Sequence, residues 1–403
     1  MVRLPLSGHR VIDATQNVAG PFCTQILADL GAEVIKVEPI RGDSTRQWGP
    51  PFWQGHSTMF MSFNRNKRSI ALDLKAEEGR SILNGLLEEA DVFVESLRPV
   101  TARKLKLDSA ALRISHPHVL VCELTAFGVT GPLAQQPGYD PLVQGFGGLV
   151  SITGHEGSPP IRVGTSIMDM GTGMWAAIGI ISALLDRATH KESTQVVRTS
   201  LFETSLAWLP YQILGFLASG EEPRRWGSEL AMLMPYGAYR TADRPIMIAV
   251  GSEKLWLAFC EGMGMLELAC DERFTSNPLR VEHRGALRAV IEDTLLGDTA
   301  DGWIEKLTSR GVPVAPLNTI PEVLEHPQTG ASGMLQPGLL EDEYQQVGIP
   351  ISINGHRPEP RMAPPRCGEH TREILSEELG LSLEEIANLE SKGTVGTWLA
   401  EPT

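Results

Sequence analysis

The sequence predicts an α/β fold with a doubly wound parallel sheet, and three observations support this prediction. A strand, a helix and a second strand follow one another near the N-terminus as a compact βαβ unit. The same alternation recurs through the first two hundred residues. The composition then shifts at 221–229 (EEPRRWGSE), where a new set of strands and helices begins. At 403 residues, the chain is long enough for two domains or more.

Each element of the large domain follows from its local pattern. Gly20 and Pro21 mark the turn between a strand at 10–15 and a helix at 21–31, and a strand at 32–39 completes the first unit. The later segments, in chain order, are a strand at 69–75, a helix at 77–90, strands at 91–96 and 118–128, and helices at 171–187 and 200–219.

The prediction divides the chain into two domains. The large domain begins at 1–220 and is completed by a return segment at 326–403, while a smaller α+β domain occupies 225–325. A proline-rich stretch at 311–328 leads back toward the large domain. The return segment is predicted to form short strands at 334–340 and 347–353 and helices within 368–395.

The charge and the hydropathy of the chain exclude several classes of function. Asp and Glu number 49 and Lys and Arg 35, a net charge of −14 that disfavours nucleic-acid binding, which needs a basic face. Residues 1–15 contain no apolar stretch of signal-peptide length, and we expect no run long enough to span a membrane. The sequence therefore predicts a cytoplasmic protein that binds neither nucleic acid nor membranes.

The cysteines indicate neither disulfides nor a metal site. They are odd in number, lie far apart and form no CxxC pair. We interpret them as ordinary core or surface thiols and predict no bound metal. The five are Cys23, Cys122, Cys260, Cys270 and Cys367.

Asp169 is the most informative single residue. It lies in the run RVGTSIMDMGTG at 162–173, directly before an apolar segment at 174–185. One interpretation is an N-cap of a helix. The other is a covalent nucleophile, because a carboxylate can attack an activated carbonyl, and a helix N-terminus favours its ionised form. The sequence around Asp169 is compatible with both.

Several loops have the composition of a ligand site. The first turn, at 15–25, lacks the GxGxxG spacing of dinucleotide enzymes, although Glu38 occupies the place of a ribose-binding acid. Basic residues that follow strand ends suit a ligand with several phosphates, such as coenzyme A. These residues are Arg46, Lys67, Arg68, Lys75, Arg98, Arg103 and Lys104.

The glycine-rich loop at 127–154 carries Tyr139 and Asp140 in its middle. Glycines permit close approach of the backbone to a ligand, and N–H groups in such a loop can face a developing oxyanion. Because the loop ends near Asp169 in the sequence, we expect the two to share one cleft. The alternative is a surface loop with the tyrosine packed beneath it.

These residues together resemble the family III coenzyme A transferases, the formyl-CoA transferase family, over essentially the whole chain. Within the family, the chain is most similar to the succinyl-CoA:dicarboxylate branch that includes the glutarate enzyme, through WGPPF, EPRRWGSE and PYGAYRT. The segments that carry the family resemblance are NVAGPFCTQILADLGAEVIKVEP, NRNKRSIALDLK, DVFVESLRP, GPLAQQPGYDPLVQGFGGLVSITG, MDMGTG and GEHTREIL.

The resemblance implies that Asp169 is the nucleophile. Its carboxylate would attack an acyl-CoA to give a mixed anhydride, and the CoA thiolate would return to form an aspartyl-CoA thioester that the acceptor acid consumes. The substrates would be an acyl-CoA, with succinyl-CoA as donor, and a carboxylic acid; no permanently bound cofactor is implied. The implied CoA contacts are Val18, Ala19, Leu72, Lys75, Ser96, Leu97, Arg98, Lys104, Gly138, Tyr139 and Asp140.

The resemblance also implies a large Rossmann-like domain and a small domain joined into a ring-shaped subunit, with two rings interlocked as a homodimer. By their positions, Arg162 and the pair Arg224 and Arg225 beside Trp226 are candidates to hold the distal carboxylate of a dicarboxylate, and the alternative for each is a surface or inter-subunit charge. Tyr139 is expected to contact the substrate.

The chain departs from the formyl-CoA transferase pattern at several positions. Val18, Pro39, Ser96 and Pro137 replace a glutamine, an arginine, an asparagine and a lysine, which puts the CoA contacts at these points in doubt. The glycine-rich run of the oxalate enzymes is reduced to 251–253 (GSE), which argues against oxalate.

Two other functions stay open. The first is a 2-methylacyl-CoA racemase, whose His-Asp pair is replaced here by Tyr139 and Asp140. Tyrosine, with a pKa near 10, is a poor base at neutral pH, and His155 is the candidate substitute. The second is a non-catalytic acyl-CoA-binding protein that kept the fold.

Overall fold

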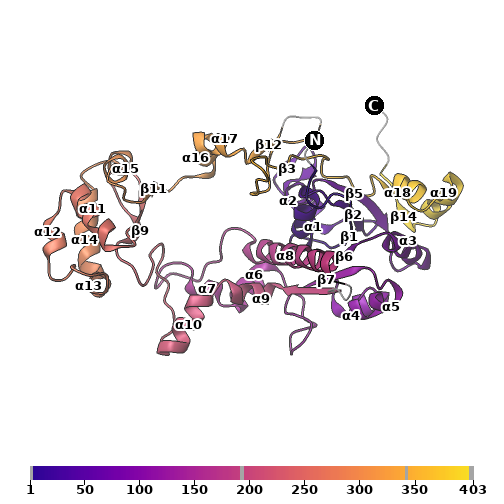
Figure 1. Ribbon diagram of the computed structural model, residues 1–403, viewed down its shortest axis with the longest axis horizontal. Coiled ribbons are helices and arrows are strands. Elements are labelled where there is room, and N and C mark those ends of the chain that lie inside the picture. Colours follow the sequence, from indigo (N-terminus) through magenta and orange to yellow (C-terminus); the bar gives the residue numbers. More distant parts are fainter. Residues whose placement is uncertain (1–2, 191–194, 341–343, 399–403) are drawn as a thin grey trace. The chain divides into compact units, whose positions relative to one another are not determined.

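The computed structural model describes residues 3–190, 195–340 and 344–398, and the chain forms two compact units (Figure 1). The small unit comprises Val150–Ile161 and Ser219–Thr329, so a short segment ahead of Asp169 belongs to it. The larger set of segments, which we call the large unit, comprises Met1–Leu149, Arg162–Ala218 and Gly330–Thr403.

The large unit is built on a seven-stranded sheet in the order β14-β5-β2-β1-β6-β7-β8. All neighbours are parallel except the edge strand β14 (Val395–Gly396), which pairs antiparallel with β5. Leaving β14 aside, this is the strand order 3-2-1-4-5-6 of doubly wound nucleotide-binding folds, so the predicted α/β fold with a parallel sheet is confirmed. The parallel strands are β1 (Arg10–Ala14), β2 (Glu33–Glu38), β5 (Lys67–Leu72), β6 (Val92–Glu95), β7 (Leu120–Thr125) and β8 (Val196–Ser200).

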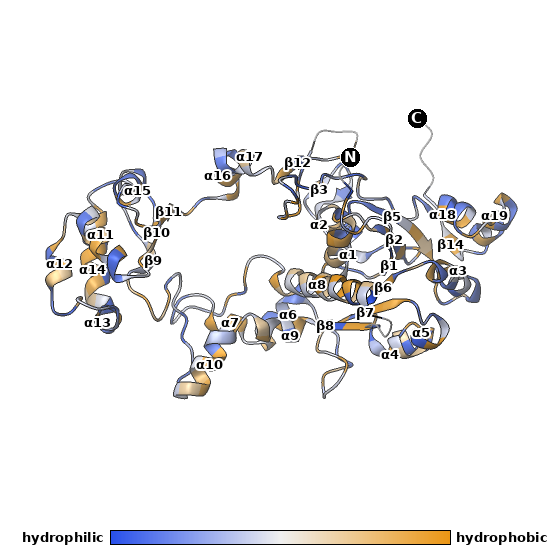
Figure 2. Ribbon diagram, in the orientation of Figure 1, coloured by the Kyte–Doolittle hydropathy of each residue, from blue (hydrophilic) through white to orange (hydrophobic). Residues whose placement is uncertain are grey.

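Helices cover both faces of this sheet because successive strand residues point to opposite sides. Val11 faces an apolar cluster shared with α1 and α8, and its neighbour Ile12 faces one shared with α3, α18 and α19. Ile12 pairs in register with Ile35 and Phe93, which lie in the same cluster. Figure 2 shows the apolar colouring along the strands. The main covering helices are α1 (Ala19–Asp29), α3 (Glu77–Glu88), α4 (Pro99–Leu105), α5 (Ser109–Ser115), α8 (Ile167–Thr189), α18 (Thr371–Glu377) and α19 (Leu383–Ser391).

The helix α8 differs from its prediction in two ways. It begins four residues earlier than predicted, at Ile167, so Asp169 is its third residue and Ser166 occupies the N-cap position. The helix has 23 residues, and an 18-residue window within it has a mean hydropathy of 1.4, enough by length and composition to cross a membrane, so the expectation that no run reaches that length was wrong. The helix packs instead against α1 and the sheet, where Ala176 and Ile180 are buried.

Other differences concern short elements that local patterns do not reveal. The strand β8 was not predicted, and the single helix expected at 200–219 is two helices, α9 (Leu201–Ala207) and α10 (Pro210–Ser219). The loop at 127–154 contains α6 (Asp140–Phe146) and α7 (Leu149–Ile152). The remaining elements of this part are η1 (Ser44–Gln47), β3 (Phe52–Trp53), β4 (His56–Ser57), α2 (Thr58–Phe63), β12 (Leu335–Pro337) and β13 (Gln345–Val347), the last lying mostly ahead of the predicted strand at 347–353.

The small unit combines an antiparallel sheet in the order β11-β10-β9 with helices around one apolar core. Trp256, Phe259 and Leu287 are buried in this core. All five cysteines of the chain are free, as predicted. The elements are β9 (Tyr236–Tyr239), β10 (Ile246–Ala249), α11 (Glu253–Met263), α12 (Glu267–Cys270), α13 (Asn277–Glu282), α14 (Arg284–Leu295), α15 (Ala300–Thr308), β11 (Val314–Pro316) and α16 (Ile320–Glu325), followed by α17 (Pro327–Ser332) at the boundary.

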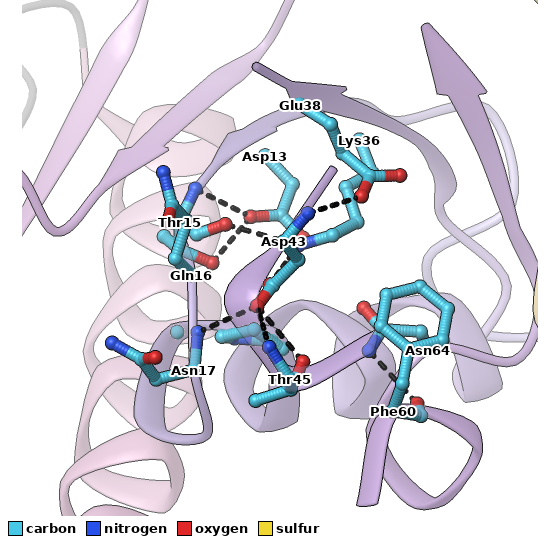
Figure 3. Close-up of polar contacts among 12 residues, drawn as sticks. Asp13, Thr15, Gln16, Asn17, Lys36, Glu38, Asp43, Thr45, Phe60 and Asn64 are labelled. Atoms are coloured by element: carbon cyan, nitrogen blue, oxygen red, sulfur yellow. Dashed lines mark hydrogen bonds and ion pairs between the residues drawn. The ribbon is translucent and has the colours of Figure 1, made fainter. Parts of the chain in front are cut away.

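A buried ionic network supports the loop that follows β1 (Figure 3). The Asp13 carboxylate lies 3.1 Å from Lys67 Nζ, and Lys36 Nζ lies 3.0 Å from both the Asp43 carboxylate and the Thr15 carbonyl oxygen. Burial alone would raise the pKa of Asp13, but Lys67 and Lys36 outweigh it and hold that pKa well below its usual range. The network therefore fixes the chain just before the predicted CoA contacts.

We predict that Asp13→Asn lowers the free energy of unfolding by about 3–5 kcal/mol, because it leaves Lys67 buried without the carboxylate of its ion pair, whereas Lys36 keeps Asp43. The matched control is Glu78→Gln, which breaks an ion pair with Lys392 whose side chains are both 50% exposed, and we expect less than about 1 kcal/mol. Urea denaturation of both variants measures the difference. Equal losses would show that the network contributes no more than a surface pair.

Candidate active site

Asp169 and the predicted CoA contacts lie in segments that meet at one edge of the sheet. Ligands of doubly wound sheets bind beyond the carboxyl ends of the strands, where the strand order reverses. Here the order reverses between β1 and β6, and the Gln16 N–H donates to Ser96 Oγ (3.2 Å) across that point. Because α8 connects the parallel strands β7 and β8, its N-terminus, with Asp169, lies at the same edge.

The predicted CoA contacts occupy the loops at this edge. Val18 is buried at the N-cap of α1, and Ala19 begins that helix. Leu72 ends β5. Beyond β6, Leu97 N–H donates to Glu95 Oε2 (2.6 Å), and burial raises the pKa of Glu95 to about 8. The side chains of Lys75, Arg98 and Lys104 are exposed and form no hydrogen bond or ion pair with any residue that the structure describes, which leaves their charges available to an anionic ligand.

Three of the basic residues that the sequence suggested for phosphate binding are already engaged. Lys67 is fully buried on Asp13, so the suggestion that it binds a phosphate was wrong. Arg46 forms an ion pair with Glu38, and Arg68 forms ion pairs with acids that include Glu378. Glu38 is thus occupied by protein donors and does not match the exposed acid of a ribose site.

Asp169 is partly buried in the first turn of α8, and a second carboxylate supports that turn. Asp140 Oδ2 accepts hydrogen bonds from Met168 N–H (2.7 Å) and Asp169 N–H (3.3 Å). The N-cap residue Ser166 makes no side-chain cap. The N-cap interpretation of Asp169 was therefore wrong, because the capping carboxylate comes from α6.

The ionisation of Asp169 also differs from expectation. Burial, followed by the negative charge of Asp140, raises the pKa of Asp169 to about 7. The sequence argument held that the helix N-terminus would keep this aspartate ionised. The Asp169 carboxylate gains no such stabilisation, because the N–H groups of Met168 and Asp169 in the first turn donate to Asp140, and its own side chain forms no hydrogen bond within the described part of the chain.

The glycines of the MDMGTG segment bring neighbouring helices close. A Cβ at Gly173 would lie 2.5 Å from the Ala19 carbonyl oxygen, and one at Gly171 would lie 2.8 Å from the Trp208 ring. Gly173 lies four residues after Asp169, so both share one face of α8. This face is turned toward the start of α1, which places the carboxylate beside the loop of Val18 and Ala19.

The loop after β7 closes over the strand end. A Cβ at Gly138 would lie 2.6 Å from the Ala126 Cβ. Tyr139, at the N-cap of α6, is 52% exposed, so the alternative of a tyrosine packed beneath the loop was wrong. Phe146, which is 58% exposed, packs edge-on against Phe127, with ring centroids 5.3 Å apart.

Gln144 is a site residue that the sequence analysis missed. It is fully buried, and its amide contacts both Asp140 and the backbone ahead of α8. The only local signal was its spacing of four residues from Asp140, which places both on one side of a helix.

The two predicted carboxylate-binding arginines lie in different units. Arg162, in the large unit, is exposed, donates to the Val163 carbonyl oxygen (3.0 Å) and has no acidic partner among the described residues. Arg225, in the small unit, donates to the Ser158 carbonyl oxygen (2.6 Å). His155, the candidate racemase base, also lies in the small unit, bridged to Trp226.

Comparisons with known proteins agree on one family. Residues 6–371 match the model of CoA-transferase family III. The chain is 34% identical to the succinyl-CoA:glutarate CoA-transferase of Homo sapiens (97% of this chain, 90% of that one) and 36% identical to the acetyl-CoA:oxalate CoA-transferase of Acetobacter aceti (93% and 95%). A CAIB/BAIF family protein from Brucella suis, with a solved structure, is 35% identical, with a TM-score of 0.82 over 93% of this chain and 100% of that one. The chain therefore belongs to CoA-transferase family III, and it is a CoA transferase.

Proposed function

We propose that this enzyme moves CoA from succinyl-CoA to a dicarboxylic acid through covalent intermediates on Asp169. The observation that carries the proposal is the position of this carboxylate. It lies at the ligand-binding edge of the sheet, one helical turn before Gly173, which meets Ala19, and none of the described residues forms a hydrogen bond with its side chain. The human relative named for succinyl-CoA and glutarate supports the choice of substrates.

The chemistry balances without a net proton transfer. An Asp169 oxygen attacks the thioester carbonyl, the C–S bond breaks, and a mixed anhydride and CoA thiolate form. The thiolate then attacks the Asp169 carbonyl carbon, expels the donor acid and leaves an aspartyl-CoA thioester. The acceptor carboxylate attacks the aspartyl-CoA thioester, which gives a second mixed anhydride and releases the CoA thiolate. The thiolate then attacks the acceptor's carbonyl carbon in that anhydride, which gives the acceptor's CoA ester and the free Asp169 carboxylate.

The remaining residues are assigned to binding. Lys75, Arg98 and Lys104 hold the phosphates of CoA, and backbone N–H groups near Gly138 face the carbonyl oxygen as charge develops on it. Tyr139 contacts the acyl group, and Asp140 holds the first turn of α8. The apolar contacts to CoA come from Val18, Ala19, Leu72 and Leu97, with Ser96 at the switch point of the sheet.

Asp169→Asn is expected to lower turnover by roughly 10³-fold or more, because an amide cannot carry the acyl group. Wild-type enzyme and the variant are incubated with succinyl-CoA and a panel of acids, glutarate and oxalate included, and new CoA esters are measured by mass spectrometry.

The Asp169 pKa is raised to about 7, so wild-type kcat/KM should be high above pH 7 and fall as the pH drops through that value. Retained transfer in the variant, or α-deuterium exchange in a 2-methylacyl-CoA without transfer, would contradict the proposal.

We propose that Arg162 binds the distal carboxylate of the acceptor. It is exposed, has no acidic partner among the described residues, and lies seven residues before Asp169 in the same unit. Arg162→Leu should raise the KM for glutarate about 10- to 100-fold, the value of one charge-assisted hydrogen-bonded pair, and leave the KM for butyrate unchanged. Arg225→Leu serves as the comparison. An equal effect of Arg162→Leu on both acids would refute this role, and a selective effect of Arg225→Leu would move it there.

We also propose a homodimer of interlocked ring-shaped subunits. The support is α10, which buries none of its residues although it carries five large apolar side chains, Tyr211, Ile213, Leu214, Phe216 and Leu217. Sedimentation equilibrium is expected to give the mass of two chains. The double change of Leu214 and Leu217, which are 68% and 73% exposed, to Glu should shift it toward one. A monomeric wild type at micromolar concentration would contradict this assembly.

A further inference from the structure

Gln144 joins α6 to the segment at 163–165, which lies 19 to 21 residues further along the chain. Its Nε2 donates to Asp140 Oδ1 (2.6 Å) and more weakly to the Thr165 carbonyl oxygen (3.4 Å). Its Oε1 accepts from Val163 N–H (2.8 Å). One buried amide thus connects α6 with the backbone segment that leads into α8.

These contacts determine how the Asp140 carboxylate is turned. With Oδ1 held by Gln144, Oδ2 points to the N–H groups of Met168 and Asp169. The carboxylate therefore has a donor on each side, and rotation about its Cβ–Cγ bond would break bonds on both. The site needs a donor and an acceptor on one side chain, a combination that a neutral amide provides and an ionised carboxylate does not.

We propose that Gln144 is a positioning residue for the transferase reaction: its amide fixes the orientation of the Asp140 carboxylate and, through it, the first turn of α8 that presents Asp169. The proposal rests on the proposed function, because it assumes that Asp169 reacts. Gln144 itself touches neither substrate nor the reacting atoms.

The same amide ties the nucleophile to the acceptor-binding segment. Val163 follows Arg162 directly, and its N–H is held by Gln144 Oε1. Displacement of the amide would therefore move the start of α8 and the backbone next to Arg162 together. Loss of Gln144 should consequently change kcat as well as the KM for the acceptor.

The test is Gln144→Glu, which keeps the shape and an acceptor for Val163 N–H. At acidic pH the new side chain is protonated and can still donate to Asp140. At alkaline pH two carboxylates would face each other across a contact that is 2.6 Å in the native protein, and repulsion should turn Asp140 away from α8. The ratio of wild-type to variant kcat/KM should therefore grow at least about tenfold, roughly 1.4 kcal/mol, between pH 6 and pH 9.

Two further variants distinguish a role of the Gln144 hydrogen bonds from a role of its side-chain volume alone. Gln144→Met fills a similar volume without either hydrogen bond, so its loss should be the same at every pH. Gln135→Glu adds the same charge in the exposed part of the loop and should follow wild type. A Gln144→Glu variant whose activity is reduced by one constant factor from pH 6 to pH 9, or not at all, would overturn the proposal.

Thermal unfolding tests the contact between Gln144 and Asp140 without a measurement of catalysis. The melting temperature of Gln144→Glu relative to wild type should fall as the pH rises, whether or not Asp169 reacts. If Asp169→Asn still transfers CoA while this pH-dependent loss of stability is present, the proposed function is wrong and the Gln144–Asp140 contact stands. If Asp169→Asn is inactive and Gln144→Glu follows wild type in both measurements, the positioning role is wrong and the proposed function stands.

Discussion

The site depends on one buried carboxylate that caps a helix from outside it. Asp140 belongs to α6, yet its Oδ2 accepts the N–H groups of Met168 and Asp169 in the first turn of α8. Those groups would otherwise favour an anion on Asp169 itself. Because Asp140 takes them, Asp169 is left partly buried beside a like charge, and its pKa rises to about 7. A carboxylate of raised pKa is more basic, and therefore a better nucleophile once ionised.

The large unit uses its charged residues in two different ways. One set is buried beneath the loop after β1, where Asp13, Lys67, Lys36 and Asp43 satisfy one another and hold the backbone in place. The other set, Lys75, Arg98 and Lys104, lies exposed after the strand ends, where these side chains pair with none of the residues that the structure describes. The first set builds the edge of the sheet, and the second is available to a phosphate-bearing substrate.

Local sequence patterns predicted the elements well where the apolar periodicity and the turn residues of a strand or helix identify it. The βαβ unit from Arg10 to Glu38 and the paired helices α18 and α19 are found close to the predicted residues. The pattern could not show that Lys67 is buried, because its partner Asp13 is 54 residues away. It could not assign the cap of α8 for the same reason, since the bond from Met168 to Asp140 spans 28 residues. Asp169 was identified as a candidate from its setting, whereas Gln144 is meaningful only once α6 and α8 are adjacent.

The most direct test of the account is to identify the residue that carries the acyl group and CoA during turnover. The enzyme is incubated with succinyl-CoA, quenched with hydroxylamine, digested and analysed by peptide mass spectrometry. We expect a hydroxamate on Asp169, formed from its anhydride or thioester, only when the acyl-CoA is present. A hydroxamate on another acid, or full turnover with Asp169 never modified, would contradict it.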